Sequence, residues 1–331
     1  MELKTGENDC GRRLDRILRK ALKNHPLPLL YRLLRQGLVF VDGKPAKAQS
    51  RVNAGAVISI PLQDSPACSL ALQSNVSSKL PEILWQGKGL LAVNKPAGIS
   101  VHGEKSLDNI VRSYLSGKLP QSLSFRPGPL HRLDKPSSGI VVFSTSLDGA
   151  RFFSASLKEH SIRKIYLALL EGKLEKEETW QDELVRDKKT KKTFLKGQSG
   201  SMSYLSGAKT AYTRVLPVAV NNNYSLIEAQ IITGRTHQIR AQAAAAGRPL
   251  AGDYKYGGSP LQQNNALQKS RKKPHVGFFL HAWKLEFQDI YIEAPLPPAF
   301  RDLINRMFGS TLPFGYSSPG LPCGKSQDFH L

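Results

Sequence analysis

The chain has 331 residues, a length typical of two domains, at least one of which can bury a sizeable core. Hydrophobic residues make up 40% and charged residues 22%, a globular composition that excludes a disordered or collagen-like chain. The formal net charge of +21 favours polyanionic partners, and nucleic acid is the first of them, although charge alone identifies no ligand.

The cysteines and the apolar segments limit the environment. Cys10, Cys68 and Cys323 are isolated, with no CxxC pair and no histidine at ligand spacing, so we expect neither a disulfide nor a zinc site. The opening is polar and no run of about 18 apolar residues occurs, which argues against a signal peptide and a membrane span. We therefore expect a cytoplasmic protein with no membrane partner.

The first sixty residues predict a small basic module. Leucine and isoleucine recur at helical spacing within 11–24 and again within 27–37, where Gly37 is a natural stop. An Asp-Gly pair at 42–43 predicts a tight turn between extended segments, and a further strand follows at 56–61. Twelve Lys and Arg against five Asp and Glu up to residue 60 indicate a basic face, for which simple solvation is the plainer alternative.

The composition changes after this module. Residues 62–80 are rich in Ser, Pro and other polar residues and predict a linker. From 81 to 308, short apolar strands alternate with helical segments near 105–116 and 147–160, a mixture typical of an α+β domain.

Three polar segments are expected to be irregular. The lysine-dense stretch 186–197 and the polar stretch 259–273 predict mobile loops. The Gly, Pro and Ser-rich tail 309–331 predicts disorder.

The densest polar cluster is HRLDKPSSG at 131–139, directly before an apolar strand at 140–143. Reactive groups often lie where a loop meets a rigid strand, which makes Asp134 a candidate. A surface turn whose Asp and Ser side chains bind backbone amides is the alternative for this segment taken alone.

A second cluster, GRTHQIR at 234–240, follows an expected strand at 226–232. A carboxylate in a cleft stays ionised only with a nearby cation or hydrogen bonds, so Asp134 and Arg240 can form a pair. A helix start with a threonine cap is the alternative. A metal site on His131, His237 and His281 is disfavoured, because no acidic ligand recurs at a suitable spacing.

These segments resemble a known family. HRLDKPSSGIVVF is similar to the HRLDxxTSG signature of RluA-type pseudouridine synthases, and motifs around it occur in the family's order. They are NKPAGISVHG (94–103), KIYLALLEG (164–172), GRTHQIR (234–240), GRPLAGDYKYGG (247–258) and LHAWKLEF (280–287). The resemblance implies a mixed, mainly antiparallel β-sheet with flanking helices.

The family's reaction implies roles for the matching residues. Pseudouridine formation breaks the N1–C1′ bond of a uridine and joins C5 to the ribose, and it requires no cofactor. The resemblance implies Asp134 as the catalytic carboxylate, Arg240 as its partner, Tyr166 stacked on the uracil, and Arg132 in the place of the flipped base. A core tyrosine is the alternative for Tyr166. The implied substrate contacts are His131, Arg132, Leu133, Arg235, Thr236, His237 and Gln238.

The N-terminal module, at 11–61, resembles an S4 RNA-binding domain. The resemblance implies phosphate contacts from Arg12, Arg13, Arg16, Arg32 and Arg35. An S4 domain followed by VHG after NKPAG is most similar to the RluC branch, which implies large-subunit ribosomal RNA as the partner and a monomeric enzyme.

Two departures and two alternatives stand beside this assignment. Ser137 replaces the usual threonine, and Ala241-Gln242 replaces the usual Val-His next to the cleft, which affects the expected choice of target. A noncatalytic ribosome-assembly protein would keep the RNA grip without the reaction. A hydrolase would need a second carboxylate beside Asp134.

Overall fold

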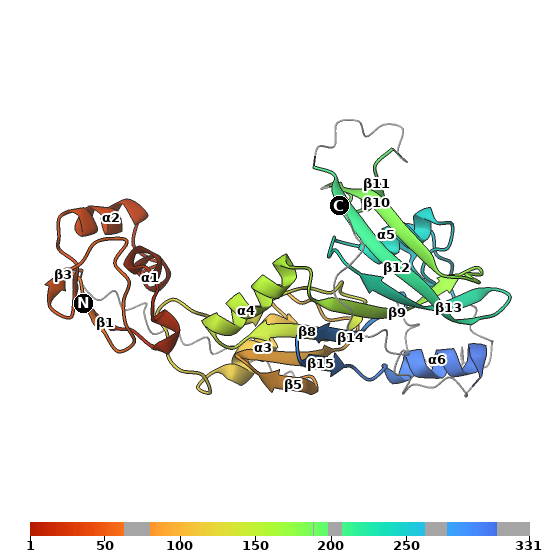
Figure 1. Cartoon of the computed structure of the whole chain (residues 1–331), viewed down its shortest axis with the longest axis horizontal. Helices are drawn as coiled ribbons and strands as arrows, with labels where there is room; N and C mark the ends of the chain where they lie inside the picture. Colours follow the sequence, from red (N-terminus) through yellow and green to blue (C-terminus); the bar gives the residue numbers. More distant parts are fainter. Residues whose placement is uncertain (63–79, 188, 198–206, 262–276, 310–331) are drawn as a thin grey trace.

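The computed structural model describes residues 1–62, 80–187, 189–197, 207–261 and 277–309. It shows a small N-terminal domain and a larger second domain that follow one another along the long axis of the molecule (Figure 1). Three expected segments lie mostly outside the described residues. Of the linker 62–80 the structure describes only 62 and 80, of the polar stretch 259–273 only 259–261, and of the tail 309–331 only 309. None of the described helices is long and apolar enough to cross a membrane.

The N-terminal domain packs two helices against a four-stranded sheet of order β1-β4-β2-β3. Leu14, Ile17 and Leu18 on the first helix and Leu30 on the second are almost fully buried, as their spacing predicts. Its elements are β1 (Glu2–Lys4), the 3-10 helix η1 (Glu7–Asp9), α1 (Leu14–Ala21), α2 (Leu27–Arg35), β2 (Phe40–Val41), β3 (Lys44–Pro45) and β4 (Val57–Ser59).

This domain begins earlier than the expected boundary at residue 11. Strand β1 pairs antiparallel with β4, from Glu2 opposite Ser59 to Lys4 opposite Val57. Only Leu3 of this strand faces the core, so the three residues are too short and too polar to predict a strand. The turn at Asp42 and Gly43 is as predicted, with φ of +49° and +75° that match a type I′ hairpin.

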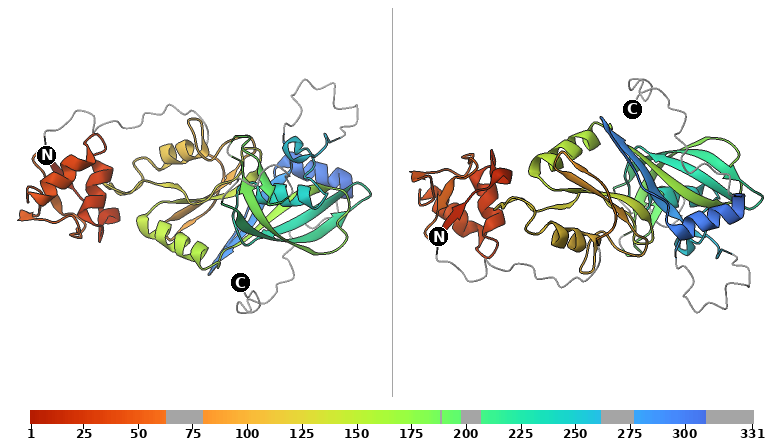
Figure 2. Two further views of the ribbon diagram at one scale, coloured as in Figure 1. Left: turned by 90° about the horizontal axis from the view of Figure 1, so that it is seen from above. Right: turned by 90° about the horizontal axis from the view of Figure 1, so that it is seen from below.

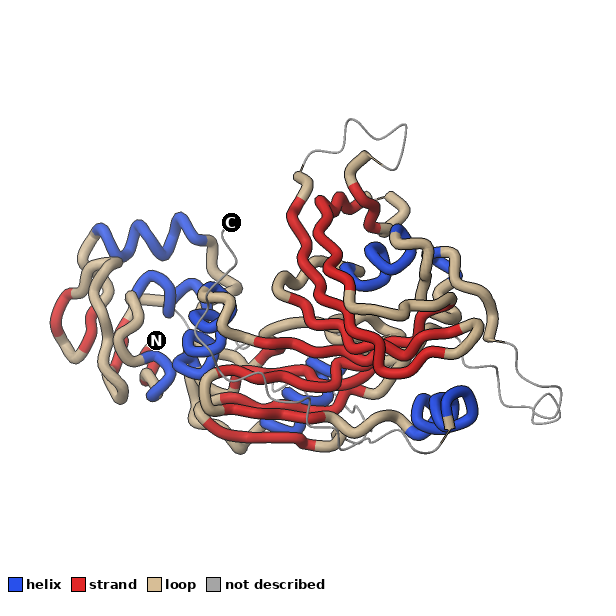
Figure 3. Tube along the Cα trace, turned by 45° about the vertical axis from the view of Figure 1, so that its right-hand side comes forward, coloured by secondary structure: helices blue, strands red, loops and turns tan. Residues whose placement is uncertain are grey.

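The second domain is built on one mixed sheet, mainly antiparallel, of order β11-β10-β12-β13-β9-β14-β8-β6-β5, with β15 beside β14 and β7 beside β8 (Figure 3). Its first half contains β5 (Ile83–Gly87), β6 (Leu90–Lys95), α3 (Leu107–Leu115), β7 (Gly128–Pro129), β8 (Ser138–Ser144) and α4 (Leu147–Lys158). The remainder contains β9 (Arg163–Glu171), β10 (Glu178–Arg186), β11 (Thr193–Leu195), β12 (Lys209–Val220), β13 (Tyr224–Ile231), α5 (Gln238–Ala245), η3 (Tyr254–Tyr256), β14 (Leu280–Phe287), β15 (Ile290–Glu293) and α6 (Pro298–Phe308).

Helices cover both faces of this sheet. Alternate residues of β9 point to opposite faces, so that Tyr166 joins the core under α3 and α5 while Ile165 joins the core under α6. Helix α4 lies on the face opposite α3 (Figure 2). The face of Tyr166, α3 and α5 also carries the pocket that contains Asp134.

The helices expected near 105–116 and 147–160 are confirmed as α3 and α4. Each begins at a serine, Ser106 or Ser146, whose hydroxyl accepts a hydrogen bond from the amide three residues later. The expectation of a mobile loop over 186–197 is wrong in part, because 193–195 form β11, which pairs with the end of β10. The pairing gives the backbone of this lysine-rich segment partners that its composition did not reveal.

The two halves of the sheet meet where β8 pairs in parallel with β14, the one parallel pairing among the described strands. Gly139 lies opposite Ala282 with φ +106°, and a Cβ there would come within 2.2 Å of the Ala282 carbonyl oxygen. Any larger residue would separate the strands at this point, five residues after Asp134.

Substituting Gly139→Ala should therefore destabilise the second domain by about 3 kcal/mol, from the combined clash and backbone strain. Gly98→Ala is the matched control: Gly98 also has a positive φ of +90°, but a Cβ there meets nothing within 4 Å. All three tryptophans lie in the second domain, so urea unfolding followed by tryptophan fluorescence reports this domain alone. Equal losses in the two variants would contradict the close approach.

Two histidines are built into this junction as neutral side chains. His281 Nδ1 accepts from the Ser138 hydroxyl at 2.8 Å, and its Nε2 donates to the Ala294 carbonyl at 3.1 Å. His131 Nε2 accepts from the Val142 amide at 3.1 Å. Burial lowers the pKa of His281 to about 4 and that of His131 to about 3.

Acidification should therefore destabilise the fold. Between the ordinary histidine pKa of 6.5 and about 4, the unfolded chain binds more protons than the folded one, so the free energy of unfolding falls as the pH falls. His281 alone contributes up to about 3 kcal/mol to this decline. His281→Asn should lose less stability between pH 6.5 and 4 in urea titrations, whereas exposed His102→Asn should keep the full decline. Identical declines in both variants would contradict the account.

Candidate active site

A pocket opens on the sheet face shared by α3 and α5, between the 131–137 loop and the start of α5. Its lining combines one acid, three arginines, one tyrosine and several apolar side chains. The lining residues are Arg132, Leu133, Asp134, Ser137, Tyr166, Ile231, Arg235, His237, Gln238, Ile239, Arg240 and Leu280. The structure therefore brings together the two clusters that lie a hundred residues apart in the sequence.

The loop that carries Asp134 is held from below by Lys95. This lysine, at the end of β6, is completely buried, and its ammonium donates to the carbonyls of Pro96, Lys135 and Ser137 at 2.9, 3.3 and 2.6 Å. Burial lowers the pKa of Lys95 to about 8, against the opposing effect of Asp134. The buried ammonium of Lys95 thus donates its hydrogen bonds to backbone carbonyls around Asp134 and fixes the loop.

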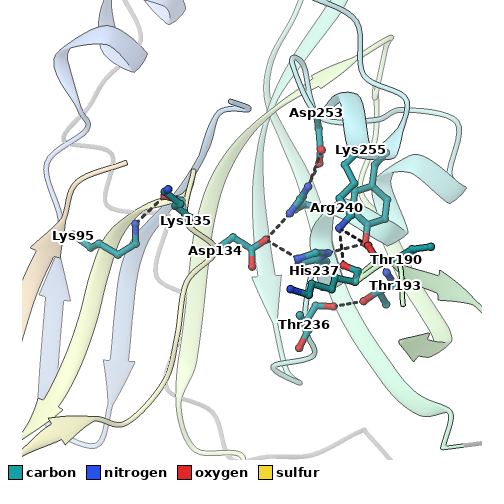
Figure 4. Close-up of polar contacts among 12 residues, drawn as sticks. Lys95, Asp134, Lys135, Thr190, Thr193, Thr236, His237, Arg240, Asp253 and Lys255 are labelled. Atoms are coloured by element: carbon teal, nitrogen blue, oxygen red, sulfur yellow. Dashed lines mark hydrogen bonds and ion pairs between the residues drawn. The ribbon is translucent and has the colours of Figure 1, made fainter. Parts of the chain in front are cut away.

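Asp134 lies at one end of a chain of charges. Its Oδ2 accepts from Arg240 Nη1 at 2.8 Å, and the same guanidinium donates through Nε and Nη2 to the two oxygens of Asp253, at 2.6 and 2.8 Å (Figure 4). The expected pairing of Asp134 with Arg240 is present in the structure. Asp253 is only 2% exposed, whereas the Asp134 side chain is 16% exposed at the pocket.

Aromatic rings enclose the Arg240 guanidinium. Its central carbon lies 4.2 Å from the Phe278 ring centroid and 4.8 Å from that of Tyr256. The attraction of two carboxylates outweighs the burial of the cation and raises the pKa of Arg240 above its already high value. Arg240 is therefore a fixed positive charge with one side facing Asp134.

His237 approaches Asp134 without being charged. It precedes α5 in a left-handed conformation, with φ +57°, and its Nε2 lies 3.8 Å from Asp134 Oδ2. Its Nδ1 is 2.9 Å from the Tyr256 hydroxyl. Burial, helped by repulsion from Arg240, lowers the pKa of His237 to about 4, so the ring is neutral at neutral pH.

Tyr166 forms a wall of the pocket. It lies on β9, is 8% exposed, and belongs to the core cluster beneath the pocket. Burial, followed by repulsion from the Asp134 carboxylate, raises the pKa of the Tyr166 phenol. The phenol is therefore protonated and can donate a hydrogen bond.

The remaining expected contacts differ in position. Arg132 and Arg235 are exposed at the rim, and Leu133 lies in the core below it. Gln238 lines the pocket, but its side-chain amide is already bound by two threonine hydroxyls and two backbone groups between residues 212 and 235. His131 and Thr236 do not line the pocket: the His131 ring stacks on Phe153, and the Thr236 carbonyl accepts from the Thr193 hydroxyl.

Two sequence interpretations need correction here. Gln242 is absent from the pocket lining; it is 1% exposed and binds the Thr213 hydroxyl, the Trp180 carbonyl and the Asp182 carboxylate. Ala241 packs with the core residues of β10 and β12. The Ala241-Gln242 pair that stands in place of Val-His therefore changes the packing below α5 and adds no side chain to the pocket. Thr236 caps no helix, because His237 is the residue before α5.

Asp253, Tyr256 and Lys95 contribute to the site but were not singled out from the sequence. Asp253 and Tyr256 lie within the motif at 247–258, but an isolated acid in a glycine-rich segment has no spacing that marks it as a partner of Arg240. Lys95 lies in NKPAG, and its burial could not be foreseen. Ser137 lines the pocket, and its buried hydroxyl has no hydrogen-bond partner among the described residues. No group of three His, Cys, Asp or Glu suited to a metal occurs in the described part of the chain.

The basic residues of the N-terminal domain are arranged in two ways. Arg16, Arg32 and Arg35 are exposed. Arg13 pairs with Asp15 at 2.9 Å, and Arg12 donates to the Ser124 hydroxyl at 2.8 Å. The first three are free to meet a polyanion, while the other two also serve contacts within the protein.

Comparison with known proteins agrees with this geometry. A model of the RNA pseudouridylate synthase family matches residues 89–245, and a model of the S4 domain matches residues 12–58. The chain is 30% identical to ribosomal large subunit pseudouridine synthase C of Pasteurella multocida, over 92% of this chain and 93% of the relative. It is also 30% identical to the protein of that name from Escherichia coli, over 91% and 94%.

A solved structure supports the fold. Human RNA pseudouridylate synthase domain containing 4 superposes with a TM-score of 0.54 at 23% identity, over 68% of this chain and 92% of that one. The mixed sheet, the pocket between its halves and the matches along the sequence lead to one assignment. The chain belongs to the RNA pseudouridylate synthase family and is an S4-domain pseudouridine synthase.

Proposed function

We propose that this enzyme converts uridines of large-subunit ribosomal RNA to pseudouridine, with Asp134 as the reacting carboxylate. The observation that carries the proposal is the Asp134 carboxylate held by Arg240 at the base of a pocket whose wall is Tyr166. A carboxylate facing a polyanion is costly to maintain, and a protein that only bound RNA would have no need of it.

The reaction is an isomerisation, and the proposed pocket supplies one carboxylate for it. The N1–C1′ bond breaks, a C5–C1′ bond forms, C5 loses a proton and N1 gains one. Hydrolysis would call for a second carboxylate to activate water. Asp253 cannot fill that role, because both of its oxygens are bound by Arg240 and it does not line the pocket.

The other pocket residues suit a flipped nucleoside. Tyr166 offers an apolar ring and a protonated phenol to the uracil. Ser137, whose buried hydroxyl has no hydrogen-bond partner in the part of the chain that the structure describes, lines the same pocket. Arg132 is exposed at the rim, where a planar guanidinium can stack in the place that the base leaves. Among the expected substrate contacts, we propose that Arg235 meets the phosphate backbone and that His131, Thr236 and Gln238 act by shaping the loops.

The proposed target rests on charge and on the relatives. The net charge of +21 and the S4 domain fit an RNA substrate, and the similar bacterial proteins are named for the ribosomal large subunit. We further propose that the enzyme acts as a monomer in the cytoplasm, since the pocket is completed by one chain.

The proposal predicts that purified protein forms pseudouridine at discrete sites of unmodified large-subunit ribosomal RNA, mapped by carbodiimide-dependent reverse-transcription stops. Asp134→Asn should lower the single-turnover rate at least about a thousandfold, because it removes the reacting carboxylate while keeping an acceptor for Arg240. Asp302→Asn, which makes the same change at an exposed position on α6, should have the wild-type rate.

Three other results would argue against it. Stops that persist in Asp134→Asn would remove this residue from the reaction. Release of free uracil would indicate hydrolysis. RNA binding without stops, on ribosomal and transfer RNA alike, would favour the noncatalytic assembly role.

A further inference from the structure

The contact between the two domains is organised around Asp9. This residue of η1 is completely buried, although it is charged and lies at the edge of the smaller domain. Its carboxylate accepts from the amides of Leu123 and Ser124 at 2.9 and 3.0 Å, and from the Ser122 and Ser124 hydroxyls. These donors belong to the segment between α3 and β7, so an acid of one domain satisfies a loop of the other.

Three further contacts fix the same junction. Asn8 Oδ1 accepts from the Leu147 amide at 2.8 Å, at the beginning of α4. The Leu123 side chain packs against the core of the N-terminal domain. Gly6 lies so close to the Gln121 carbonyl that a Cβ would come within 1.8 Å of its oxygen. Buried charge, packing and close backbone approach together indicate a defined orientation and exclude a simple tether.

Docking brings cations of the two domains together. Lys20, near the end of α1, Lys23, two residues after α1, and Arg126 are exposed. Arg126 follows by two residues Ser124, whose hydroxyl accepts from Arg12 of the N-terminal domain at 2.8 Å and whose amide donates to Asp9, so the docking contacts hold it beside that domain. Repulsion from Arg126 is the main cause that lowers the pKa of Lys23. Arg112 is partly neutralised by Asp108 at 2.9 Å, whereas Lys20, Lys23 and Arg126 have no acidic partner among the described residues. Holding like charges together is unfavourable unless a polyanion lies across them.

We propose that this junction, with Lys20 and Lys23 on one side and Arg126 on the other, is a binding site for the phosphate backbone of structured RNA, and that Asp9 is the residue that positions its two halves. The inference rests on the proposed function for its ligand. It adds a surface shared by both domains, which follow one another along the long axis of the molecule (Figures 1 and 2). This surface would set where the RNA leaves the S4 domain relative to the pocket.

The test measures binding of an unmodified large-subunit ribosomal RNA transcript by the full chain between 0.05 and 0.2 M salt, roughly the range in which phosphate contacts dominate affinity. Arg126→Ser and Lys23→Ser should each weaken binding several-fold at low salt and reduce the salt slope by about one. Arg306→Ser is the matched control, since it removes an exposed cation on α6 at the far end of the molecule. Junction variants that bind RNA like Arg306→Ser would overturn the proposed site.

Asp9→Asn distinguishes a docked S4 domain from a tethered one, because the two cases predict opposite changes in RNA affinity. Removing a negative charge should strengthen RNA binding if the S4 domain acts as an independent tethered unit. If Asp9 keeps the two domains docked at the junction, RNA binding should weaken several-fold instead. Hydrogen exchange at the Leu123, Ser124 and Leu147 amides should accelerate, while the Ile58 amide of the N-terminal sheet stays protected, which separates undocking from unfolding.

Asn8→Ala provides a second undocking variant that leaves the Asp9 carboxylate in place. Faster exchange at these amides with unchanged or tighter RNA binding would overturn the proposal, and slow exchange in both variants would overturn the role of Asp9. A wild-type chain that fails to bind the transcript would contradict the proposed function itself. If the wild-type chain binds the transcript and every junction variant binds it equally well, this inference alone is contradicted.

Discussion

The active site depends on one guanidinium that binds two carboxylates. Arg240 joins Asp253, on the segment after α5, to Asp134, on the loop before β8, and the two acids come from opposite halves of the sheet. A buried ion pair is stable only when its partners satisfy one another's hydrogen bonds, and removing one partner typically costs about 3 to 5 kcal/mol. Asp253 holds the cation with two bonds and leaves Nη1 directed at Asp134.

The remainder of the second domain keeps these groups in register. The parallel pairing of β8 with β14 at Gly139 joins the halves of the sheet, and Lys95 fixes the backbone that carries Asp134. Neutral His237 lies beside the charges without adding to them, and neutral His281 links β14 to Ser138 of β8. The positive charge of the surface can then attract RNA, while Asp134 is the one carboxylate that lines the pocket.

The sequence was most informative where residue type and spacing carry the signal. Leucine spacing predicted α1 and α2, the Asp-Gly pair predicted the first hairpin, and the chemistry of a carboxylate in a cleft predicted Asp134 beside Arg240. The high lysine content around β11 predicted a mobile loop there, whereas the strand forms because it pairs with β10. The three-residue β1 is too short for any periodicity to mark.

Contacts between distant segments could not be read in this way. Asp253 has the same appearance as any surface acid until folding places it against Arg240, and burial of Lys95 or Asp9 depends on backbone groups whose positions only the fold defines. His131 was assigned to the substrate because it belongs to the motif that resembles the family signature, yet its ring is turned toward Val142 and Phe153. Motifs thus located the site, while the division of its residues between reaction and support came from their contacts.

The most direct test of the central claim is the single-turnover rate and RNA affinity of Asp253→Asn, a residue that lies outside the pocket. An asparagine keeps the shape but weakens the hold on Arg240, so the rate should fall about a hundredfold while the dissociation constant for RNA stays within about twofold. Asp302→Asn serves as the control of equal chemistry. A rate within about threefold of wild type, with the fold intact, would show that Asp134 does not depend on this chain of charges.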